Sequence, residues 1–292
     1  MSRPQRKSVA VRLLGVVLAL SLGSCVHLKP ETLLTTSDYQ PASVEDVTAV
    51  TSYLRASVSA VTSFRAMGDL LILKSGKRYR GTQVVVFTRP DKLRLELFST
   101  ALNRLTSIIV CRNGELTTVD FEAKQAYQGM ASERNLARLT GIPLSVEQIM
   151  LLNTGRIAVS DRELENANVF RELDSGKLVV LVRDDNGRIF HLILRRLGDV
   201  QSELVFELEA VKVFDGNTEL LFIEYLKQTP STTVRQISPT IPPRIRVMVY
   251  EEDLELELSY EQADLNPVIA PDEADRLYSI TLPPGMPVKK LH

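Results

Sequence analysis

The first regular pattern of apolar positions is helical and lies between residues 43 and 64. Ser43 is followed by acids at Glu45 and Asp46, which is typical of a helix start. Apolar side chains then recur at spacings of three and four, at Val47, Val50, Leu54, Val58, Val61 and Phe64. The pattern predicts one amphipathic helix of about 20 residues, ending before Gly68.

Beyond this helix, apolar and polar residues alternate with a period of two. Residues 93–97, 244–249 and 254–260 show the alternation most clearly. It predicts antiparallel strands with one apolar face and one solvated face. Residues 84–87 and 178–182 are continuously apolar instead, which predicts strands that are covered on both faces.

Turn sequences separate many of these runs. They are Asn113-Gly114, Asp174-Ser175-Gly176, Asp185-Asn186-Gly187 and Asp215-Gly216-Asn217. The overall order is therefore one helix, about five strands, a helical insert and about six further strands.

The helical insert runs from Ser132 to about Thr154. Leu136, Leu139 and Ile142 give its first part an apolar face, which Gly141 and Pro143 bring to an end. The second part begins with Ser145 and Gln148, at the spacing of a capping box. Two short helices inside a series of strands suit an incompletely closed barrel, because its interior needs a cover.

The N-terminal region combines basic residues with a short apolar run at residues 13–22. The length of this run is typical of a secretory signal and too short to span a bilayer. Leu22-Gly23-Ser24-Cys25 resembles the bacterial lipoprotein lipobox, which implies cleavage between Ser24 and Cys25 and acylation of Cys25 with fatty acids such as palmitate. The alternative is an ordinary signal peptide with an incidental cysteine.

These features predict three parts of the chain. Residues 1–24 are a lipoprotein signal peptide, and residues 25–42 are a lipidated flexible tether with two prolines. Residues 43–292 form a single globular domain. We expect no second membrane span, because no other apolar run approaches 20 residues.

The composition of the chain limits which binding partners and which cysteine chemistry we expect. The chain has 35 Lys and Arg against 36 Asp and Glu, so nucleic acid is not an expected partner. It has two cysteines, and if Cys25 is acylated, Cys111 has no partner for an intramolecular disulfide. Cys111 follows an apolar run and is better explained as a small buried residue than as a reactive thiol.

Catalytic and metal-binding motifs are missing from the sequence. The three histidines are His27 in the tether, His191 on a strand and the terminal His292, and we predict that His191 faces solvent. The acids at residues 184–185, 251–253 and 272–273 are interpreted as solvated turn residues. We expect no enzyme activity, no cofactor and no metal.

Several stretches, in their order along the chain, carry a family resemblance. They are the lipobox, residues 92–97 with the loop that follows, residues 136–144, residues 242–247 and Pro283-Pro284-Gly285. In this order the chain resembles the LolA/LolB-like family, and within it the LolB-like outer-membrane lipoproteins. The resemblance implies a mainly β fold with some α: an antiparallel, incompletely closed β-barrel covered by the N-terminal helix and short central helices.

The resemblance also implies a non-catalytic function. The protein would bind acyl chains of lipoproteins in an apolar cavity, take them from a periplasmic LolA-like carrier and help insert them into the outer membrane. Acylated Cys25 would hold it in membrane lipid at the periplasmic face. By resemblance to enteric sorting rules, Val26, which is not Asp, implies the outer membrane and not the inner one.

Candidate site residues follow from this expectation. The cavity lining would come from Leu54, Val58, Val61, Leu95, Leu97, Ile109, Leu136, Leu139 and Ile149, and the alternative for each is ordinary core packing. Leu102 stands where the family places an exposed apolar loop residue, so it would contact membrane or carrier unless it folds back. An anchored scaffold for envelope assembly, with a filled interior, is the alternative function, and an anchored enzyme is a third.

Overall fold

The computed structural model describes residues 38–100, 104–200, 203–227, 236–237 and 241–292. Ser24, Cys25 and Leu102 lie outside these residues, as does His27. The described helices are α1 (Val44–Ser59), α2 (Glu133–Thr140), α3 (Val146–Leu152), α4 (Asp161–Glu165) and α5 (Pro271–Leu277).

One sheet holds all sixteen described strands. Those before the helical insert are β1 (Tyr39–Pro41), β2 (Ser63–Lys74), β3 (Lys77–Thr88), β4 (Lys92–Ser99), β5 (Arg104–Arg112), β6 (Glu115–Asp120) and β7 (Gln125–Met130). Those after it are β8 (Asn168–Glu172), β9 (Leu178–Arg183), β10 (Ile189–Val200), β11 (Glu203–Asp215), β12 (Thr218–Leu226), β13 (Gln236–Ile237), β14 (Arg244–Val249), β15 (Leu254–Leu265) and β16 (Val288–Lys290).

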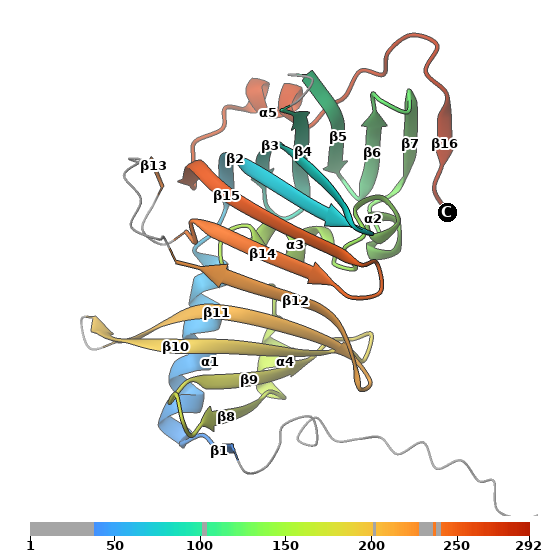
Figure 1. Ribbon diagram of the computed structural model, residues 1–292. Coiled ribbons are helices and arrows are strands. Elements are labelled where there is room, and N and C mark those ends of the chain that lie inside the picture. Colours follow the sequence, from blue (N-terminus) through green and yellow to red (C-terminus); the bar gives the residue numbers. More distant parts are fainter. Residues whose placement is uncertain (1–37, 101–103, 201–202, 228–235, 238–240) are drawn as a thin grey trace, which may run out of the picture.

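The sheet is strongly curved and does not close (Figure 1). Its order is β1-β8-β9-β10-β11-β12-β14-β15-β2-β3-β4-β5-β6-β7-β16, with β13 beside β15. The join between β15 and β2 connects the two runs of strands, while β1 and β16 remain as separate edges. The predicted class, an incompletely closed antiparallel barrel with covering helices, is confirmed, although β13 and β16 pair in parallel.

The N-terminal helix begins where the sequence predicts and ends earlier. The Ser43 side chain accepts a hydrogen bond from the Asp46 backbone N–H at 3.1 Å and caps the helix. The helix stops at Ser59 because tertiary hydrogen bonds hold the residues that follow it. Asn266 Oδ1 accepts these bonds from the backbone N–H groups of Thr62 and Ser63. Phe64 therefore belongs to β2, although its spacing fits the helical stripe.

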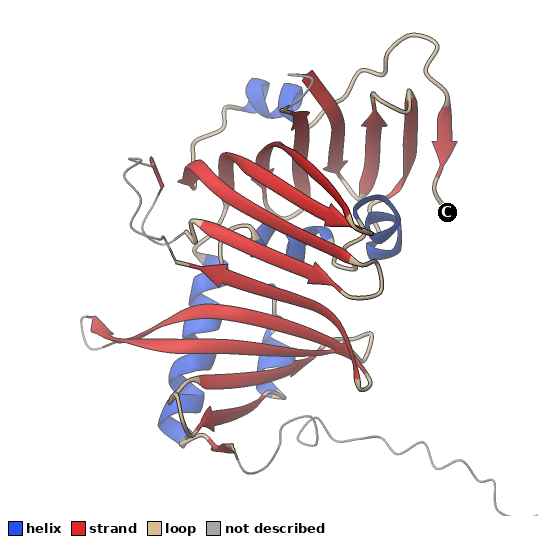
Figure 2. Cartoon of the chain, in the orientation of Figure 1, coloured by secondary structure: helices blue, strands red, loops and turns tan. Residues whose placement is uncertain are grey.

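Helix α1 crosses one face of the strands of the second run (Figure 2). It packs there through Tyr53, whose ring meets Phe206 of β11 edge-on at 5.6 Å between centroids. The apolar stripe of α1 buries Val50 and Leu54 in the main core. Helices α2 and α3 cover the middle of the barrel, and both the capping box of Ser145 and Gln148 and the stop at Gly141 are present as predicted.

The predicted turns lie between strands, and the continuously apolar strands are covered on both faces. Asn113 and Gly114 both have positive φ, at 52° and 74°, in the hairpin between β5 and β6. Residues 178–182 are all buried. Val86 in β3 belongs to a second apolar cluster, which Tyr278, directly after α5, helps to build on the outer face.

Several elements were not predicted from the sequence, among them β1, α5 and β16. Strand β1 occupies residues 39–41, within the expected tether, and pairs with β8. Helix α5 begins with Pro271 and includes Asp272 and Glu273, which were interpreted as turn residues. Strand β16 pairs with β7, and next to it Leu291 is buried against Gly129. Each depends on a partner far away in the sequence.

We expect Gly68→Ala to destabilise the fold by about 2 kcal/mol, a typical cost of overpacking. A Cβ on Gly68 would lie 2.3 Å from the Ser259 backbone oxygen and 2.8 Å from Tyr260 Cα, at the join of the two runs. The measurement is urea unfolding, with Asp69→Ala at the exposed neighbouring position as the control. Equal unfolding midpoints for the two variants would contradict this account of the join.

Candidate functional site

A cavity of about 250 Å³ lies between the inner face of the sheet and the covering helices. The sheet contributes mainly aliphatic side chains to its wall: Leu70, Ile72, Leu95, Leu97, Ile109, Ile223, Ile245, Val247, Leu256 and Leu258. The helical cover contributes Leu139, Thr140, Ile142, Leu144, Ile149, Leu152 and Asn153, and Gln83 and Ser107 complete the lining. The wall is therefore apolar with a few polar groups.

The structure brings five of the predicted lining residues together. Leu95, Leu97, Ile109, Leu139 and Ile149 all face this cavity. The other four lie elsewhere: Leu54, Val61 and Leu136 are buried in the core, and half-buried Val58 packs against it. Leu54 and Val58 belong to α1, Leu136 belongs to α2, and Val61 lies between α1 and β2. Core packing is the better explanation of all four positions.

The wall residues of β2, β12, β14 and β15 were not predicted from the sequence. The alternation in residues 244–249 and 254–260 marked their inward face, but it gave no means of separating cavity wall from packed core. Only the curvature of the sheet makes that distinction. It holds Val247 and Leu258 facing the space under α3.

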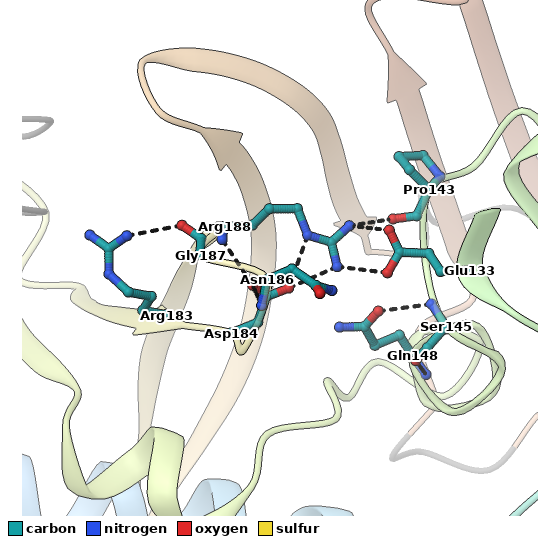
Figure 3. Close-up of polar contacts among 9 residues, drawn as sticks. All are labelled: Glu133, Pro143, Ser145, Gln148, Arg183, Asp184, Asn186, Gly187 and Arg188. Atoms are coloured by element: carbon teal, nitrogen blue, oxygen red, sulfur yellow. Dashed lines mark hydrogen bonds and ion pairs between the residues drawn. The ribbon is translucent and has the colours of Figure 1, made fainter. Parts of the chain in front are cut away.

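A buried ion-pair cluster fastens the helical cover to the sheet (Figure 3). Arg188, at the start of the β10 side of a hairpin, donates from Nη1 and Nη2 to the two carboxylate oxygens of Glu133 in α2, at 2.5 and 2.9 Å. Its Nε and Nη2 also bond Asp184 Oδ2 at 2.9 and 2.8 Å, and Nη1 bonds the Pro143 carbonyl at 2.9 Å. The side chains of Arg188 and Asp184 are each 9% exposed.

A second arginine fastens α3 on the other side. Arg89 Nη2 donates to Glu147 Oε1 at 2.6 Å, and Nη1 donates to the carbonyls of Val58 and Val61 at the end of α1. The cover over the cavity is thus attached at separate points by charged groups and lies on the apolar wall between them.

A second cavity of about 260 Å³ adjoins the first towards the C-terminal strand. It shares Ser107, Ile109 and Leu139 with the first cavity and is more polar, with Asp120 and Arg138 in its wall. Leu291, held by the pairing of β16 with β7, covers part of it.

The prediction that His191 faces solvent is wrong. Its side chain does point away from the main core, but the ring is 4% exposed and stacks on Phe214 at 4.6 Å between centroids. Neighbouring strands cover that face with a small apolar cluster built on Val179 and Leu181. Burial, with the charge of Lys212, lowers the pKa of His191 to about 4, so the ring is neutral at pH 7.

The surroundings of Cys111 and of the acidic residues show which predictions about these side chains are correct. Cys111 is fully buried, and burial raises the pKa of its thiol to about 12, so it is not a reactive thiol. Asp184 is not the solvated turn residue expected, because it pairs with Arg188. The acids at 251–253 are exposed as expected. No cluster of His, Cys, Asp or Glu in the described residues has the arrangement of a metal site.

The geometry suits reversible binding of an apolar group. The cavity offers aliphatic area and few directed polar contacts.

Among the described residues, no helix combines the length and the apolar character that crossing a membrane requires.

No protein-family model matches the chain, and no curated protein matches its sequence. Solved structures do match. The chain is similar to a DUF1329 family protein from Desulfovibrio piger, with 10% identity and a TM-score of 0.49 over 80% of this chain and 97% of the other. It is similar to a LolA superfamily protein from Nitrosomonas europaea, with 12% identity and a TM-score of 0.45 over 78% and 96%.

A third similar structure is a candidate outer membrane lipoprotein-sorting protein domain from Vibrio parahaemolyticus, with 10% identity and a TM-score of 0.47 over 79% and 95%. At these identities and TM-scores the similarity concerns the arrangement of sheet and helices, and it says nothing of ligand or activity. One of these similar structures is thus described as a LolA superfamily protein.

Proposed function

We propose that the protein is an outer-membrane lipoprotein that binds acyl chains of other lipoproteins in the cavity under α2 and α3 and helps insert them into the outer membrane. It would be anchored through acylated Cys25 at the periplasmic face, with residues 25–42 as the tether of one domain. The observation that carries the proposal is the aliphatic cavity between the inner face of the sheet and helices α2 and α3. No covalent step is part of it.

The physical basis is burial of apolar surface. Each methylene that leaves water for an apolar wall contributes about 0.8 kcal/mol, so a short stretch of acyl chain binds without any directed contact. Typical pockets for drug-sized ligands are about 300–1,000 Å³, so a cavity of about 250 Å³ suits part of one chain better than a multiply acylated group. A ligand with several acyl chains would fit only if helices α2 and α3 moved away from the sheet.

Transfer needs an exit and a donor as well as a binding site. A periplasmic LolA-like carrier is the proposed donor, and Leu102, which lies outside the described residues, is the proposed contact with membrane or carrier. The main alternative is an anchored scaffold for envelope assembly that uses the same fold without lipid transfer. A cavity is what separates these two functions, because a scaffold needs none.

We expect Leu95→Trp to weaken binding of a fluorescent fatty acid by about tenfold, the effect of losing 1.4 kcal/mol of binding free energy. Leu95 lines the cavity, and an indole there occupies space that the chain would use. The protein has no native tryptophan, so the indole also reports quenching by a brominated fatty acid. The measurement is a fluorescence titration of the soluble domain, by which we mean the protein without residues 1–25 and therefore without the proposed anchor.

Leu220→Trp is the matched control. Leu220 is also half-buried against the core but does not line the cavity. Equal loss of binding in both variants would count against the cavity as the site. A wild-type domain without saturable binding would favour the scaffold.

A further inference from the structure

The inner face of the sheet changes from aliphatic to polar across the neighbouring strands β4, β5, β6 and β7 (Figure 1). Two rows of cross-strand partners describe the change. The first row consists of Leu97, Ser107 and Asp120. The second row consists of Leu95, Ile109, Thr118 and Tyr127. Each row therefore begins in the wall of the aliphatic cavity and ends in the wall of the second, more polar cavity.

The two cavities lie directly beside each other. Ser107 and Ile109 of β5 and Leu139 of α2 line both of them, and their volumes are similar, at about 250 and 260 Å³. The second cavity is more than a solvated rim of the sheet, because Leu291 covers part of it and is itself buried against Gly129. An acyl chain in the aliphatic cavity would therefore have a covered polar space next to it.

The second cavity contains hydrogen-bond donors that the described residues do not use. Arg138, in the last turn of α2, makes no ion pair and no hydrogen bond with them. The hydroxyls of Ser107 and Tyr127 likewise make no hydrogen bond with them. The Thr118 hydroxyl differs, because it donates to the Ile108 carbonyl at 2.7 Å. Three side chains of the wall can thus donate to a ligand.

Asp120 supplies an acceptor to the same cavity. Its Oδ1 accepts from the backbone N–H groups of Glu122 and Ala123 at 2.9 and 2.8 Å. Its Oδ2 makes no hydrogen bond with the described residues, and none of them forms an ion pair with Asp120. The wall therefore presents the positive charge of Arg138 and the negative charge of Asp120, which do not pair with each other. A ligand with a net charge is attracted by one of them and repelled by the other.

We propose that the second cavity binds the amide that joins an acyl chain to the first residue of a peptide, while the chain itself lies in the aliphatic cavity. An amide has a carbonyl that accepts from Arg138 or Tyr127 and an N–H that donates to Asp120. The proposal rests on the proposed acyl binding and specifies its ligand class as N-acyl peptides. It is supported by two adjoining cavities and by the unused donors and acceptor in the second one.

Helix electrostatics and turn formation explain only part of this arrangement. Arg138 is an exposed cation near the C-terminus of α2, where a positive charge is favourable. Asp120 stabilises the turn after β6 through Oδ1. Neither role accounts for the unused hydroxyls of Ser107 and Tyr127 in the same wall. A neutral amide uses all of these groups, whereas a fatty-acid carboxylate offers nothing for Asp120 to accept.

Titration calorimetry with three ligands of equal chain length tests the subsite. The ligands are N-lauroylglycinamide, laurate and dodecanol, each below its critical micelle concentration. The protein is the soluble domain, which contains every described residue. We expect N-lauroylglycinamide to bind at least about tenfold more tightly than either of the others. Asp120 repels the charge of laurate, and dodecanol has a single hydroxyl in place of the amide.

Three substitutions should change this preference in different ways. Arg138→Met should weaken binding of N-lauroylglycinamide by about fivefold and binding of dodecanol by less than about twofold. Tyr127→Phe should weaken binding of N-lauroylglycinamide by about threefold without lowering the thermal midpoint, because the hydroxyl has no partner in the described residues. Asp120→Asn should strengthen binding of laurate by about threefold, because it removes the charge and keeps an oxygen for the turn.

Arg134→Met is the matched control. Arg134 is an exposed arginine of the same helix, and it does not line the second cavity. This variant should change none of the three affinities. Equal binding of the three ligands, or tightest binding of laurate, would overturn the subsite and leave the acyl binding intact. An unchanged preference in both Arg138→Met and Tyr127→Phe would also overturn the subsite. Binding of none of the ligands would overturn the proposed function itself.

Discussion

Arg188→Met is expected to lower the free energy of unfolding by about 3–5 kcal/mol, the range for breaking a buried ion pair by removing one partner. Arg188 makes hydrogen bonds to Glu133, Asp184 and the Pro143 carbonyl, and its own side chain is 9% exposed. Methionine keeps the apolar stem but leaves Asp184 charged and buried. The measurement is urea unfolding of the soluble domain at pH 7.

The same substitution should loosen the helical cover. Glu133 and Pro143 belong to the cover, whereas Asp184 and Arg188 belong to the hairpin of β9 and β10 (Figure 3). Hydrogen exchange should therefore become faster in α2 than in the strands around it. Loss of stability spread evenly over the sheet would show that the cluster does not act mainly on the cover.

Two further variants test whether unpaired charge causes the loss of stability in Arg188→Met. Arg162→Met removes an exposed partner of Asp185 and should change stability by no more than about 0.5 kcal/mol. Adding Asp184→Asn and Glu133→Gln to Arg188→Met should restore part of the lost stability, because the unpaired charges are then gone. A triple variant as unstable as the single one would mean that packing of the arginine stem, and not charge, is responsible.

Cys25→Ser is expected to move the protein from the membrane fraction to the soluble fraction almost completely. The reason is that the proposed acyl groups on Cys25 supply the attachment, at about 0.8 kcal/mol for each buried methylene. None of the described helices is long and apolar enough to cross a membrane. Fractionation of cells and mass spectrometry of the N-terminal peptide measure the two consequences.

Cys111→Ala is the matched control, because Cys111 is the other cysteine and is fully buried. It should leave the protein in the membrane fraction. Retention of Cys25→Ser in the membrane, or a wild-type peptide without fatty acid, would contradict the anchor.

The curved sheet illustrates what a sequence pattern can and cannot specify. Alternation in residues 254–260 predicts a strand with an apolar face, and β15 has one. Its pairing with β2, nearly 200 residues earlier by the register of Leu258 with Leu70, joins the two runs into one sheet. No local pattern specifies that pairing, because every strand with one apolar face is an equally acceptable neighbour.

The candidate site shows the same difference between what a local sequence pattern specifies and what only the tertiary structure decides. Leu95 and Leu97, from an alternating run, and Ile109, from a continuous apolar run, were predicted as wall residues, and they lie at the cavity. Leu54 and Leu136 share the same apolar character but are packed in the core. The difference is one of local packing density, which depends on how far the sheet bends away from each helix.

By itself, the sequence determined the nature of the elements: the Ser43 helix start, the two short capped helices after Ser132, and the turns such as Asn113-Gly114. These depend on residues within a few positions of each other, where capping and backbone preference act directly. The tertiary structure alone decided that α1 stops at Ser59, that His191 is buried, and that Val247 and Leu258 line a cavity. Those outcomes depend on which distant side chains cover or leave uncovered a given group, and burial and electrostatics act through space and not along the chain.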